Sequence, residues 1–354
     1  MKSPGKTLLV LIPGFASTEA DTTCLPAQQL LIRKINKLFP SLEIIVLAFQ
    51  YPFTNKEYSW YGNSVIPFNG RNKGGVSRIM LWLKIWRRLH QLKKQKNILG
   101  LFSCWCTECA LIGKYFAARN NLQHYIWICG QDALVSNKLV KFIKPHPESL
   151  IAISNAVKDE FENNHKILPK YIIENGIDTK AYADIKVEKD IDILGVGSLI
   201  ALKQFEILID IIAKLKNIQP AIKSVVCGKG PEENKLRLMI RDLRLENNIT
   251  LAGEKSHEEV LSFMQRSKIL LHPSSYEGFS GVCIEALYAG AHVISFCYPV
   301  EQPIRHWHVV SDVESTYQKA SQILNDPGID YSPVLVNDME TSAKKLMQLY
   351  NAQL

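Results

Sequence analysis

The chain is most informative between residues 270 and 290, where it reads Leu270-Leu-His-Pro-Ser-Ser-Tyr-Glu277-Gly-Phe-Ser-Gly-Val-Cys-Ile-Glu285-Ala-Leu-Tyr-Ala-Gly290. An apolar run typical of a buried strand is followed by a Pro/Ser turn, a Glu-Gly loop and an apolar helix that ends near Gly290. A loop that leads into a helix N-terminus presents free backbone N–H groups and the positive end of the helix dipole. The stretch therefore predicts a site for an anion or for hydroxyl groups.

Two glutamates, Glu277 and Glu285, bracket this loop with seven residues between them. A carboxylate accepts hydrogen bonds well from paired hydroxyls such as those of a sugar or a ribose. The alternative is a capping acid followed by a solvent-facing helix residue. Glu285 lies between Ile284 and Ala286 in an apolar helix, where an uncompensated charge is costly, so the functional interpretation is favoured.

The rest of the chain alternates short β-rich runs with longer amphipathic stretches. Strands are expected at 7–12, 44–48, 98–102, 125–129, 149–153, 171–173, 192–196, 224–226, 249–251, 269–272 and 292–295. Helices are expected at 27–39, 77–97, 205–216, 233–243 and 257–265. This alternation predicts an α/β protein with parallel sheets covered on both faces, and two such series predict two Rossmann-like, doubly wound domains.

A domain boundary is readable after the turn Asn175-Gly176-Ile177-Asp178, because a polar linker at 181–190 follows and a new buried strand then begins. We expect an N-terminal domain over 1–183 and a second domain over 184–335. In open α/β sheets ligands bind outside the carboxyl ends of the strands. Two such sheets facing each other predict a small-molecule site in the cleft between the domains.

Composition excludes several classes of protein. With 354 residues and 47% hydrophobic residues, the chain is too apolar to be disordered and long enough for two cores. It contains no run of about 18 apolar residues, so no membrane-spanning helix is expected. The apolar run near the N-terminus, Leu8–Ile12, stops at Pro13-Gly14 and is expected to be a strand rather than a secretion signal.

Eight cysteines lie in mostly apolar surroundings and are expected to be reduced, in a cytoplasmic protein. The cluster Cys104, Cys106 and Cys109 has zinc-ligating residue types but lacks a second closely spaced ligand pair. Buried, apolar cysteines are the favoured interpretation, and no metal site is predicted.

The net charge of +8 is unevenly distributed. Residues 1–180 hold 24 basic and 12 acidic side chains, whereas residues 181–354 hold 18 and 22. No acidic residue lies between Glu57 and Glu108, while nine basic ones do. This asymmetry predicts an anionic partner for the first half: membrane lipid, nucleic acid or a phosphorylated substrate.

Within that basic region, residues 77–97 predict an amphipathic helix. One face would carry Lys84, Arg87, Arg88, Gln91 and Lys94, and the other Ile79, Trp82, Ile85, Trp86 and Leu89. One interpretation is attachment of Arg78–Lys96 to an anionic membrane with the tryptophans at the interface. The other, favoured for the Trp face, is burial against the sheet. Nucleic acid is not the expected partner, because no recognition module or stacking platform is present.

The segment from Glu277 to Glu285 resembles the Glu-x7-Glu signature of the retaining glycosyltransferases of family 4, the glycosyl transferases of group 1, which have the GT-B fold. Four further segments resemble family motifs in the expected order, namely Glu174–Asp178 (Asn-Gly-Ile/Val-Asp turn), Gly197–Lys203 (Gly-Arg-Leu-x-x-x-Lys), Val226–Pro231 (Gly-x-Gly-Pro), and Leu251–Gly253 followed by His257–Leu261. The resemblance covers most of residues 170–295, and the N-terminal half matches only weakly.

The resemblance implies that residues 184–335 bind a nucleotide sugar, linked to UDP or GDP. Lys203 would hold the diphosphate, Glu285 would accept hydrogen bonds from the ribose and Glu277 would contact the transferred sugar. The expected donor-binding residues are Gly14, Gly197, Ser198, Lys203, Gly228, Gly253, Glu277, Gly278, Phe279, Ser280, Gly281 and Glu285. Many members carry an Arg where this chain has Ser198, so one phosphate-neutralising charge is missing or comes from elsewhere.

For the first half, the resemblance implies an acceptor-side domain onto which a last helix, near 338–350 within 336–354, crosses back. Gly14 ends the first strand and resembles a loop that faces the donor; the alternative is a turn glycine. Asp132 follows the strand 125–129 and stands near a point where members carry His or Asp; the alternative is a helix N-cap. Glu277, Asp132 and Lys203 are the expected catalytic residues, and the polar loop 17–24 could face the acceptor.

The function implied is a retaining, metal-independent hexosyltransferase that moves a sugar from a nucleotide sugar to a glycan or lipid-linked acceptor. In this type of enzyme the leaving diphosphate takes the acceptor proton on the same face as bond breaking, and the protein supplies electrostatics and positioning. The alternatives are a nucleotide-sugar epimerase of the same fold and a non-catalytic scaffold that binds a membrane or polyanion. The expected location is cytoplasmic, peripheral at the inner membrane face.

Overall fold

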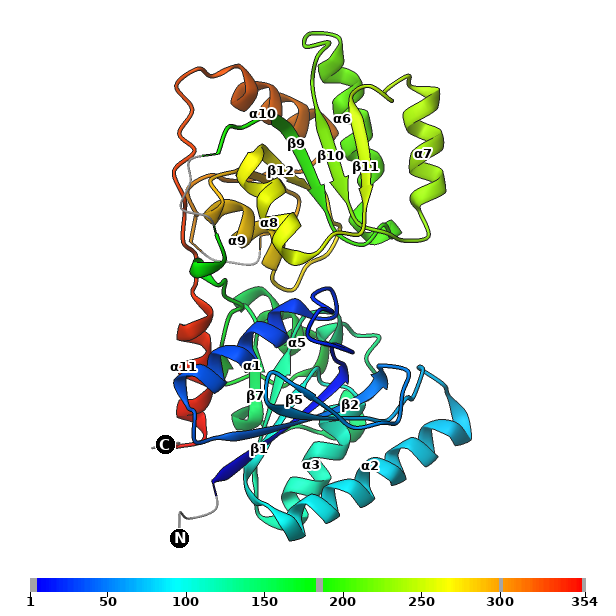
Figure 1. The fold of residues 1–354 in the computed structure, drawn as a ribbon, viewed down its shortest axis with the longest axis vertical. Helices are drawn as coiled ribbons and strands as arrows, with labels where there is room; N and C mark the ends of the chain where they lie inside the picture. The colour runs from blue at the N-terminus through cyan, green and yellow to red at the C-terminus, as the bar shows by residue number, and fades with distance from the viewer. Residues whose placement is uncertain (1–4, 183–186, 299–301, 352–354) are drawn as a thin grey trace. The chain divides into compact units, whose positions relative to one another are not determined.

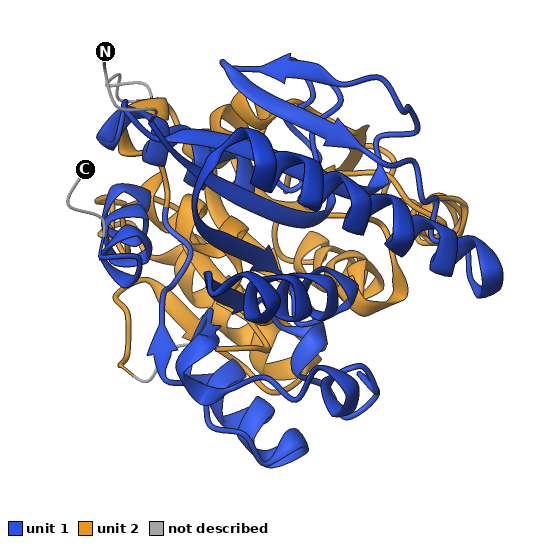
Figure 2. Cartoon of the chain, turned by 90° about the horizontal axis from the view of Figure 1, so that it is seen from below, with its two compact units in different colours: residues 1–176, 339–354 blue, residues 177–338 orange. Residues whose placement is uncertain are grey.

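The computed structural model describes residues 5–182, 187–298 and 302–351. The chain divides into two compact units (Figures 1 and 2). Unit 1 consists of residues 1–176 and 339–354, and unit 2 of residues 177–338. Among the described residues, no helix is both long and apolar enough to cross a membrane.

Unit 1 is built on an eight-stranded sheet with the order β3-β4-β2-β1-β5-β6-β7-β8. Its strands are β1 (Lys6–Gly14), β2 (Glu43–Tyr51), β3 (Tyr58–Trp60), β4 (Asn63–Pro67), β5 (Asn97–Cys104), β6 (Gln123–Ile128), β7 (Leu150–Ala152) and β8 (Tyr171–Ile172). Every neighbouring pair is parallel except β3 with β4. Consecutive residues Leu8–Ile12 of the central β1 are all buried, as expected where helices cover both faces of a parallel sheet.

The helices of unit 1 are α1 (Pro26–Leu38), α2 (Gly75–Gln95), α3 (Glu108–Asn120), α4 (Val140–Ile143), α5 (Asn155–His165) and α11 (Met339–Leu349). One core cluster packs Leu9 and Leu11 of β1 against α2 and α3. On α2 the contact is made by Leu81, Ile85 and Leu89, which are spaced to lie on one helix face.

Unit 2 has a six-stranded, fully parallel sheet with the order β11-β10-β9-β12-β13-β14. Its strands are β9 (Ile191–Val196), β10 (Ser224–Cys227), β11 (Ile249–Gly253), β12 (Ser267–His272), β13 (His292–Ser295) and β14 (Trp307–Val309). Its helices are α6 (Phe205–Lys216), α7 (Glu233–Asp242), α8 (His257–Arg266), α9 (Gly281–Tyr288) and α10 (Val313–Asn325).

Both sheets follow the Rossmann plan. In each, the first strand of the unit is central and the strand order reverses beside it, between β1 and β5 in unit 1 and between β9 and β12 in unit 2. Loops diverge at such a switch point and leave a crevice at the carboxyl ends of the strands. The predicted α/β class with two doubly wound, Rossmann-like domains is therefore confirmed.

The unit boundaries differ slightly from the predicted 183/184 and 335/336. The division falls after Gly176, inside the predicted turn, because Ile177 forms a β-bridge with Asp338 and both belong to unit 2. Part of the predicted linker, 183–186, lies outside the described residues. The last helix belongs to unit 1, and the Tyr350 hydroxyl just after it donates to Leu101 O over 2.6 Å.

Most predicted elements lie within a few residues of the observed ones, but some elements were not predicted. The missed elements are β3, β4, β14, α3, α4, α5 and α10. Of these, β3, β4 and β14 are only three to five residues long. A run this short carries too few apolar positions to establish a period of two.

On α2 the prediction for one residue was wrong. Trp82 and Trp86 do pack against the core cluster, as favoured from the sequence. Ile79, which was assigned to the same buried face, is instead 56% exposed. The helix contacts the core through Leu81, Ile85, Leu89 and Leu92, and Ile79 lies more than 90° around the helix from the centre of that face.

Candidate functional site

The carboxyl ends of β9, β10 and β11 bring three of the predicted glycines to one edge of unit 2. Gly197 N donates to Cys227 O over 3.0 Å, and Gly228 N donates to Gly253 O over 2.8 Å. Gly228 has φ +149°, and a Cβ placed there would lie 1.9 Å from Gly197 O. Only glycine fits this position, and its lack of a side chain lets the backbones after β9 and β10 approach each other closely.

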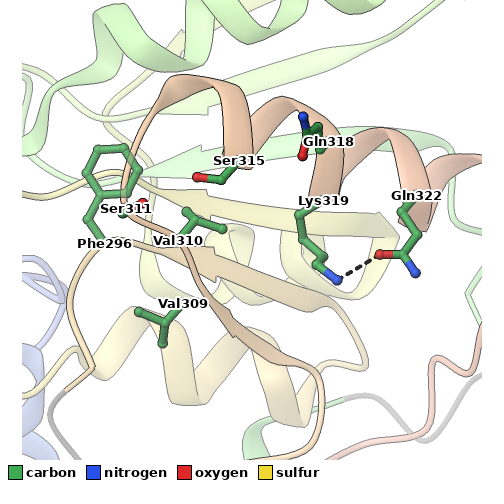
Figure 3. A pocket seen from close by; sticks show the side chains of 8 residues that line it. All are labelled: Phe296, Val309, Val310, Ser311, Ser315, Gln318, Lys319 and Gln322. Atoms are coloured by element: carbon green, nitrogen blue, oxygen red, sulfur yellow. Dashed lines mark hydrogen bonds between the residues drawn. The ribbon is translucent and has the colours of Figure 1, made fainter.

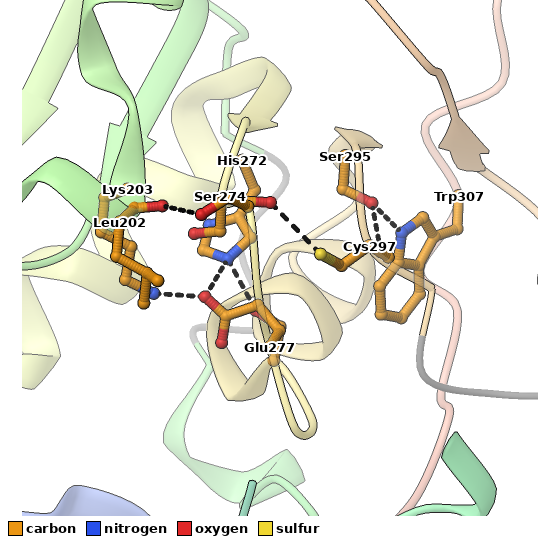
Figure 4. A network of polar contacts seen from close by, with 10 residues as sticks. Leu202, Lys203, His272, Ser274, Glu277, Ser295, Cys297 and Trp307 are labelled. Atoms are coloured by element: carbon orange, nitrogen blue, oxygen red, sulfur yellow. Dashed lines mark hydrogen bonds and ion pairs between the residues drawn. The ribbon is translucent and has the colours of Figure 1, made fainter. Parts of the chain in front are cut away.

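Lys203 and Glu277 meet across the switch point of the unit 2 sheet. Lys203 ends a 3-10 turn, Ala201–Lys203, after β9, and Glu277 lies in the loop after β12. The Lys203 Nζ lies 2.5 Å from Glu277 Oε1, and the two side chains are 19% and 15% exposed (Figure 4). Two residues 74 positions apart in the chain thus form a largely buried ion pair.

His272, the last residue of β12, completes this cluster. Its Nε2 lies 2.9 Å from the same oxygen, Glu277 Oε1, and 3.3 Å from Ser280 Oγ. Because a carboxylate only accepts, Nε2 carries the proton of this hydrogen bond. Burial opposes ionisation of Glu277, but the His272 hydrogen bond and the Lys203 charge outweigh it and lower the pKa of Glu277 to about 2. Glu277 is therefore a fixed carboxylate at neutral pH.

The turn that carries Lys203 is tied directly to the loop that carries Glu277. Ser275 N donates to Leu202 O over 3.0 Å. On the other side of the loop, the Cys297 thiol donates to Ser274 O over 3.2 Å (Figure 4). These contacts restrain both sides of the loop and hold the Lys203–Glu277 pair in one geometry.

Glu285, the second glutamate of the motif, lies in α9 and has a histidine partner from α8. His257 Nε2 is 2.7 Å from Glu285 Oε1. The hydrogen bond to Glu285 raises the pKa of His257 above its usual range. The carboxylate predicted to need compensation in an apolar helix is thus compensated by an imidazole.

The loop between the two glutamates leads into α9 as predicted. Phe279 and Ser280 are buried, Ser280 is the N-cap residue, and Gly281 begins the helix. Gly278 is buried as well. The loop is therefore a packed segment at the start of a helix, which is the geometry expected of a site for hydroxyl or phosphate oxygens.

Ser198, which stands where many members of the resembled family carry an arginine, is exposed and lies beside Lys229 in the structure. Leu199 N donates to Lys229 O over 2.9 Å, so residues 198 and 229 come from adjacent strand ends. Lys229 is also exposed. A basic residue is thus available next to the position where many members of the resembled family carry an arginine.

The residues predicted in unit 1 have mainly internal partners. Asp132 is buried and accepts from Cys106 N (2.7 Å), Cys129 N (3.0 Å) and Gly130 N (2.9 Å). Burial raises the pKa of Asp132 to about 6, against these backbone donors, which lower it. Asp132 is not a helix N-cap, because Gly130 holds that position before the 3-10 turn Gln131–Ala133. With three amides on its carboxylate, Asp132 instead holds the loops after β5 and β6 together, a role that was not predicted.

Gly14 is the last residue of β1, where it is buried and pairs with Tyr51 of β2. In the following polar loop, Asp21 accepts from Ser17 N and Cys24 N, and Glu19 accepts from Tyr61 N. The two acidic residues of this loop therefore organise unit 1 itself.

A pocket of about 390 Å³ lies at the switch point of the unit 1 sheet, where the carboxyl end of β2 meets the segments that follow β1, β4 and β5. It is lined by Pro13, Leu25, Gln50, Asn72, Arg78, Trp105, Thr107, Glu108 and Leu139. Glu108 accepts from the side chains of Gln50 and Trp82. This pocket was not predicted from the sequence. Glu108, the first acidic residue after fifty residues without one, was the available signal.

A second pocket, of about 650 Å³, lies in unit 2 beside β14 and α10 (Figure 3). Its lining includes Phe296, Val309 and Lys319 but none of the predicted site residues. In the described part of the chain, no group of three or more His, Cys, Asp or Glu side chains is placed to hold a metal ion.

Unit 2 resembles known proteins in sequence. Residues 178–327, nearly the whole of unit 2, match the family described as glycosyl transferases group 1. The chain is 29% identical over 168 residues to the phosphatidylinositol N-acetylglucosaminyltransferase gpi3 subunit of Schizosaccharomyces pombe. It is 31% identical over 170 residues to the N-acetylgalactosamine-N,N'-diacetylbacillosaminyl-diphospho-undecaprenol 4-alpha-N-acetylgalactosaminyltransferase of Campylobacter jejuni.

These alignments are partial. They cover 46% of this chain in both cases, and 37% and 45% of the two relatives. The chain thus aligns with less than half the length of each of these two relatives.

Solved structures resemble the whole chain in fold. Sucrose-phosphate synthase of Thermosynechococcus elongatus matches with a TM-score of 0.71 and 15% identity over 98% of both chains. Anabaena HepE in complex with UDP and glucose matches with a TM-score of 0.67 and 16% identity over 98% of this chain and 97% of HepE. The fold is therefore that of the GT-B glycosyltransferases, as predicted.

Proposed function

We propose that this protein is a glycosyltransferase that moves a sugar from a nucleotide-sugar donor, linked to UDP or GDP, to a glycan or lipid-linked acceptor. The observation that carries the proposal is the cluster of Lys203, Glu277 and His272 at the switch point of unit 2. Within it, Glu277 lies eight residues before Glu285. A cation, a fixed carboxylate and the N-terminus of α9 at one sheet edge suit a ligand that carries both phosphates and hydroxyls. The match of unit 2 to the group 1 family supports the same assignment.

Each residue has a role in this proposal. Lys203 contacts the diphosphate, Glu277 accepts a hydrogen bond from the transferred sugar, and His272 is a positioning residue that fixes the Glu277 carboxylate. Glu285 accepts hydrogen bonds from the ribose hydroxyls while His257 holds it in place. The amides of Phe279, Ser280 and Gly281 meet sugar hydroxyls or phosphate oxygens.

Lys229 replaces the arginine that is absent at Ser198. The Lys229 carbonyl accepts a hydrogen bond from Leu199 N, and its side chain, in the loop after β10, is exposed. A flexible ammonium there neutralises a phosphate as a point charge, without the two-point geometry of a guanidinium. We expect Lys229→Gln to weaken binding of the donor nucleotide and Ser198→Arg to compensate for it.

The reaction we propose is transfer with retention of configuration and without a metal ion. The bond from the anomeric carbon to the diphosphate oxygen breaks, the acceptor oxygen bonds to that carbon on the same face, and the acceptor proton passes to the departing diphosphate oxygen. Lys203 and Lys229 stabilise the charge that develops on the diphosphate. We assign the acceptor to the unit 1 pocket, whose polar lining includes Gln50, Arg78 and Glu108.

Thermal-shift screening against UDP, GDP and ADP sugars, followed by turnover with the best donor, tests the proposal. We expect one donor to stabilise the protein and its sugar to appear on an acceptor with the anomeric configuration unchanged. Lys203→Gln and Glu277→Gln should each lower kcat by at least about 100-fold. Near-wild-type turnover in either variant contradicts the site assignment.

The other outcomes identify the alternatives. Nucleotide release that needs no acceptor and yields a new sugar epimer indicates an epimerase. Failure of every nucleotide sugar to bind indicates a non-catalytic scaffold. A product with inverted configuration refutes the retaining chemistry while leaving the transferase assignment intact.

A further inference from the structure

The solvent-facing side of α2 begins with large apolar side chains. Val76, Ile79, Met80 and Leu83 are 73%, 56%, 56% and 50% exposed, although the opposite face of the same helix is buried in the core. Their spacing of three, four and seven residues places them on one side of the first two turns. We call these four residues the apolar stripe.

The same side of α2 becomes basic further along. Arg87 and Lys94 continue the line of the apolar stripe, Lys84 lies beside it, and all three are exposed. In the described ranges, none of these three has a carboxylate within ion-pair distance. Arg88 is different, because it is paired with Glu57 over 2.7 Å. No Asp or Glu occurs anywhere from residue 58 to residue 107, so this surface carries an uncompensated positive charge.

We propose that this face of α2 docks on the surface of an anionic phospholipid bilayer, with the apolar stripe among the upper acyl chains and Lys84, Arg87 and Lys94 among the headgroups. The apolar stripe spans about 10 Å of helix, enough to bury an apolar face at the acyl boundary of a bilayer. Long basic side chains keep their ammonium or guanidinium groups in the headgroup layer while their stems cover apolar surface. The charge selects an anionic surface.

The apolar stripe lies in the same turns of α2 as Arg78, which lines the unit 1 pocket. The first turns of α2 follow β4 and lie at the carboxyl edge of the unit 1 sheet, where Arg78 of the same turns lines the pocket. The docking itself does not depend on the proposed reaction, because it is measured without donor or acceptor.

Cosedimentation of the full chain with vesicles tests the apolar stripe. The vesicles are phosphatidylcholine with and without about 30% phosphatidylglycerol. We expect binding only with phosphatidylglycerol, and at least about tenfold weaker binding for Ile79→Gln/Leu83→Gln. The matched control is Ile218→Gln/Leu238→Gln, because those side chains are 58% and 50% exposed in unit 2. The control should bind as the wild type does, and circular dichroism verifies that both variants fold.

A second pair of variants tests the charge. At about fivefold per basic residue, Lys84→Gln/Arg87→Gln/Lys94→Gln should weaken binding by about 100-fold. The control Lys166→Gln/Arg244→Gln/Lys344→Gln removes the same charge from other exposed positions and should change binding little.

Several results overturn the proposal. One is the absence of wild-type binding to the anionic vesicles. Another is an equal loss of binding in the variants and in their controls. The last is a dimer in solution that Ile79→Gln/Leu83→Gln dissociates, with no binding to vesicles. The last result would assign the apolar stripe to a second copy of the chain.

Discussion

Replacement of Lys203 by methionine keeps the length of the side chain and removes its charge from the Glu277 carboxylate. The lowering of the Glu277 pKa from 4.5 to about 2 corresponds to about 3 kcal/mol in favour of the ionised form, supplied by His272 and Lys203 against the cost of burial. Because the two side chains are only 19% and 15% exposed, water replaces the missing ammonium poorly. We expect Lys203→Met to destabilise unit 2 by about 2 kcal/mol at pH 7.

Calorimetric unfolding is the assay. For a unit of about 160 residues, a loss of about 2 kcal/mol lowers Tm by about 4–8 °C. The control is the double variant Lys203→Met/Glu277→Gln, which removes both charges. It should be more stable than the sum of the single variants predicts, because no buried carboxylate is left without its partner. Additive single effects, or an unchanged Tm for Lys203→Met, would refute the reasoning.

The same pair predicts a pH dependence. A carboxyl group whose pKa is lowered by folding contributes stability that is complete above its unfolded value of about 4.5 and is lost as the pH falls through about 2. The difference in stability between the wild type and Lys203→Met should therefore be constant above about pH 5 and shrink below it. A difference that grows toward low pH contradicts the assignment of the ion pair.

Three further predictions concern other positions. Protonated His257 pairs with Glu285, so the contribution of this pair to stability is complete below about pH 6.5 and is lost as the pH rises through the higher pKa of the folded state. His257→Gln should abolish this loss when Tm is measured as a function of pH, and an unchanged pH profile argues against the pair. Gly228→Ala places a Cβ 1.9 Å from a carbonyl oxygen and should lower the free energy of unfolding, measured by denaturant titration, by more than about 3 kcal/mol. The control Gly253→Ala, at φ +73° with nothing within 4 Å of the new Cβ, should lower it by only about 1 kcal/mol. Asp132→Asn weakens the hydrogen bonds from three backbone amides and should lower the free energy of unfolding by about 2–4 kcal/mol, while kcat of the folded protein falls less than about tenfold. A much larger fall in kcat at unchanged stability would indicate that Asp132 is catalytic.

The elements that the sequence predicted best are those with a strong local signal. Five consecutive apolar residues, Leu8–Ile12, stopped by Pro13-Gly14, are too short for a buried helix and indicate a strand buried on both faces. Helix 205–216 has the predicted bounds because its apolar residues repeat with the helical period. Glu277 and Glu285 were found for a related reason. A carboxylate in apolar surroundings must have a partner, and this requirement is visible in the sequence before the partner is known.

The partners themselves could not be predicted. His272 ends a buried strand and His257 begins a helix, and neither position differs locally from that of a core or surface histidine. They contact Glu277 and Glu285 only because the sheet order places β12 beside β9 and packs α8 near α9. Lys203 likewise reaches Glu277 through the parallel pairing of strands far apart in the chain.

By itself, then, the sequence determined the α/β class, the two Rossmann-like halves, the strand–loop–helix segment that carries Glu277 and Glu285, and the concentration of positive charge in the first half. These follow from composition, from periodicity and from the cost of burying charge, which are local properties. Only the tertiary structure decided which side of α2 faces solvent, with Ile79 outside and Trp82 against the core, and that Asp132 anchors loops through backbone amides. The physical reason is that burial and hydrogen-bond partners are set by packing between elements distant in sequence.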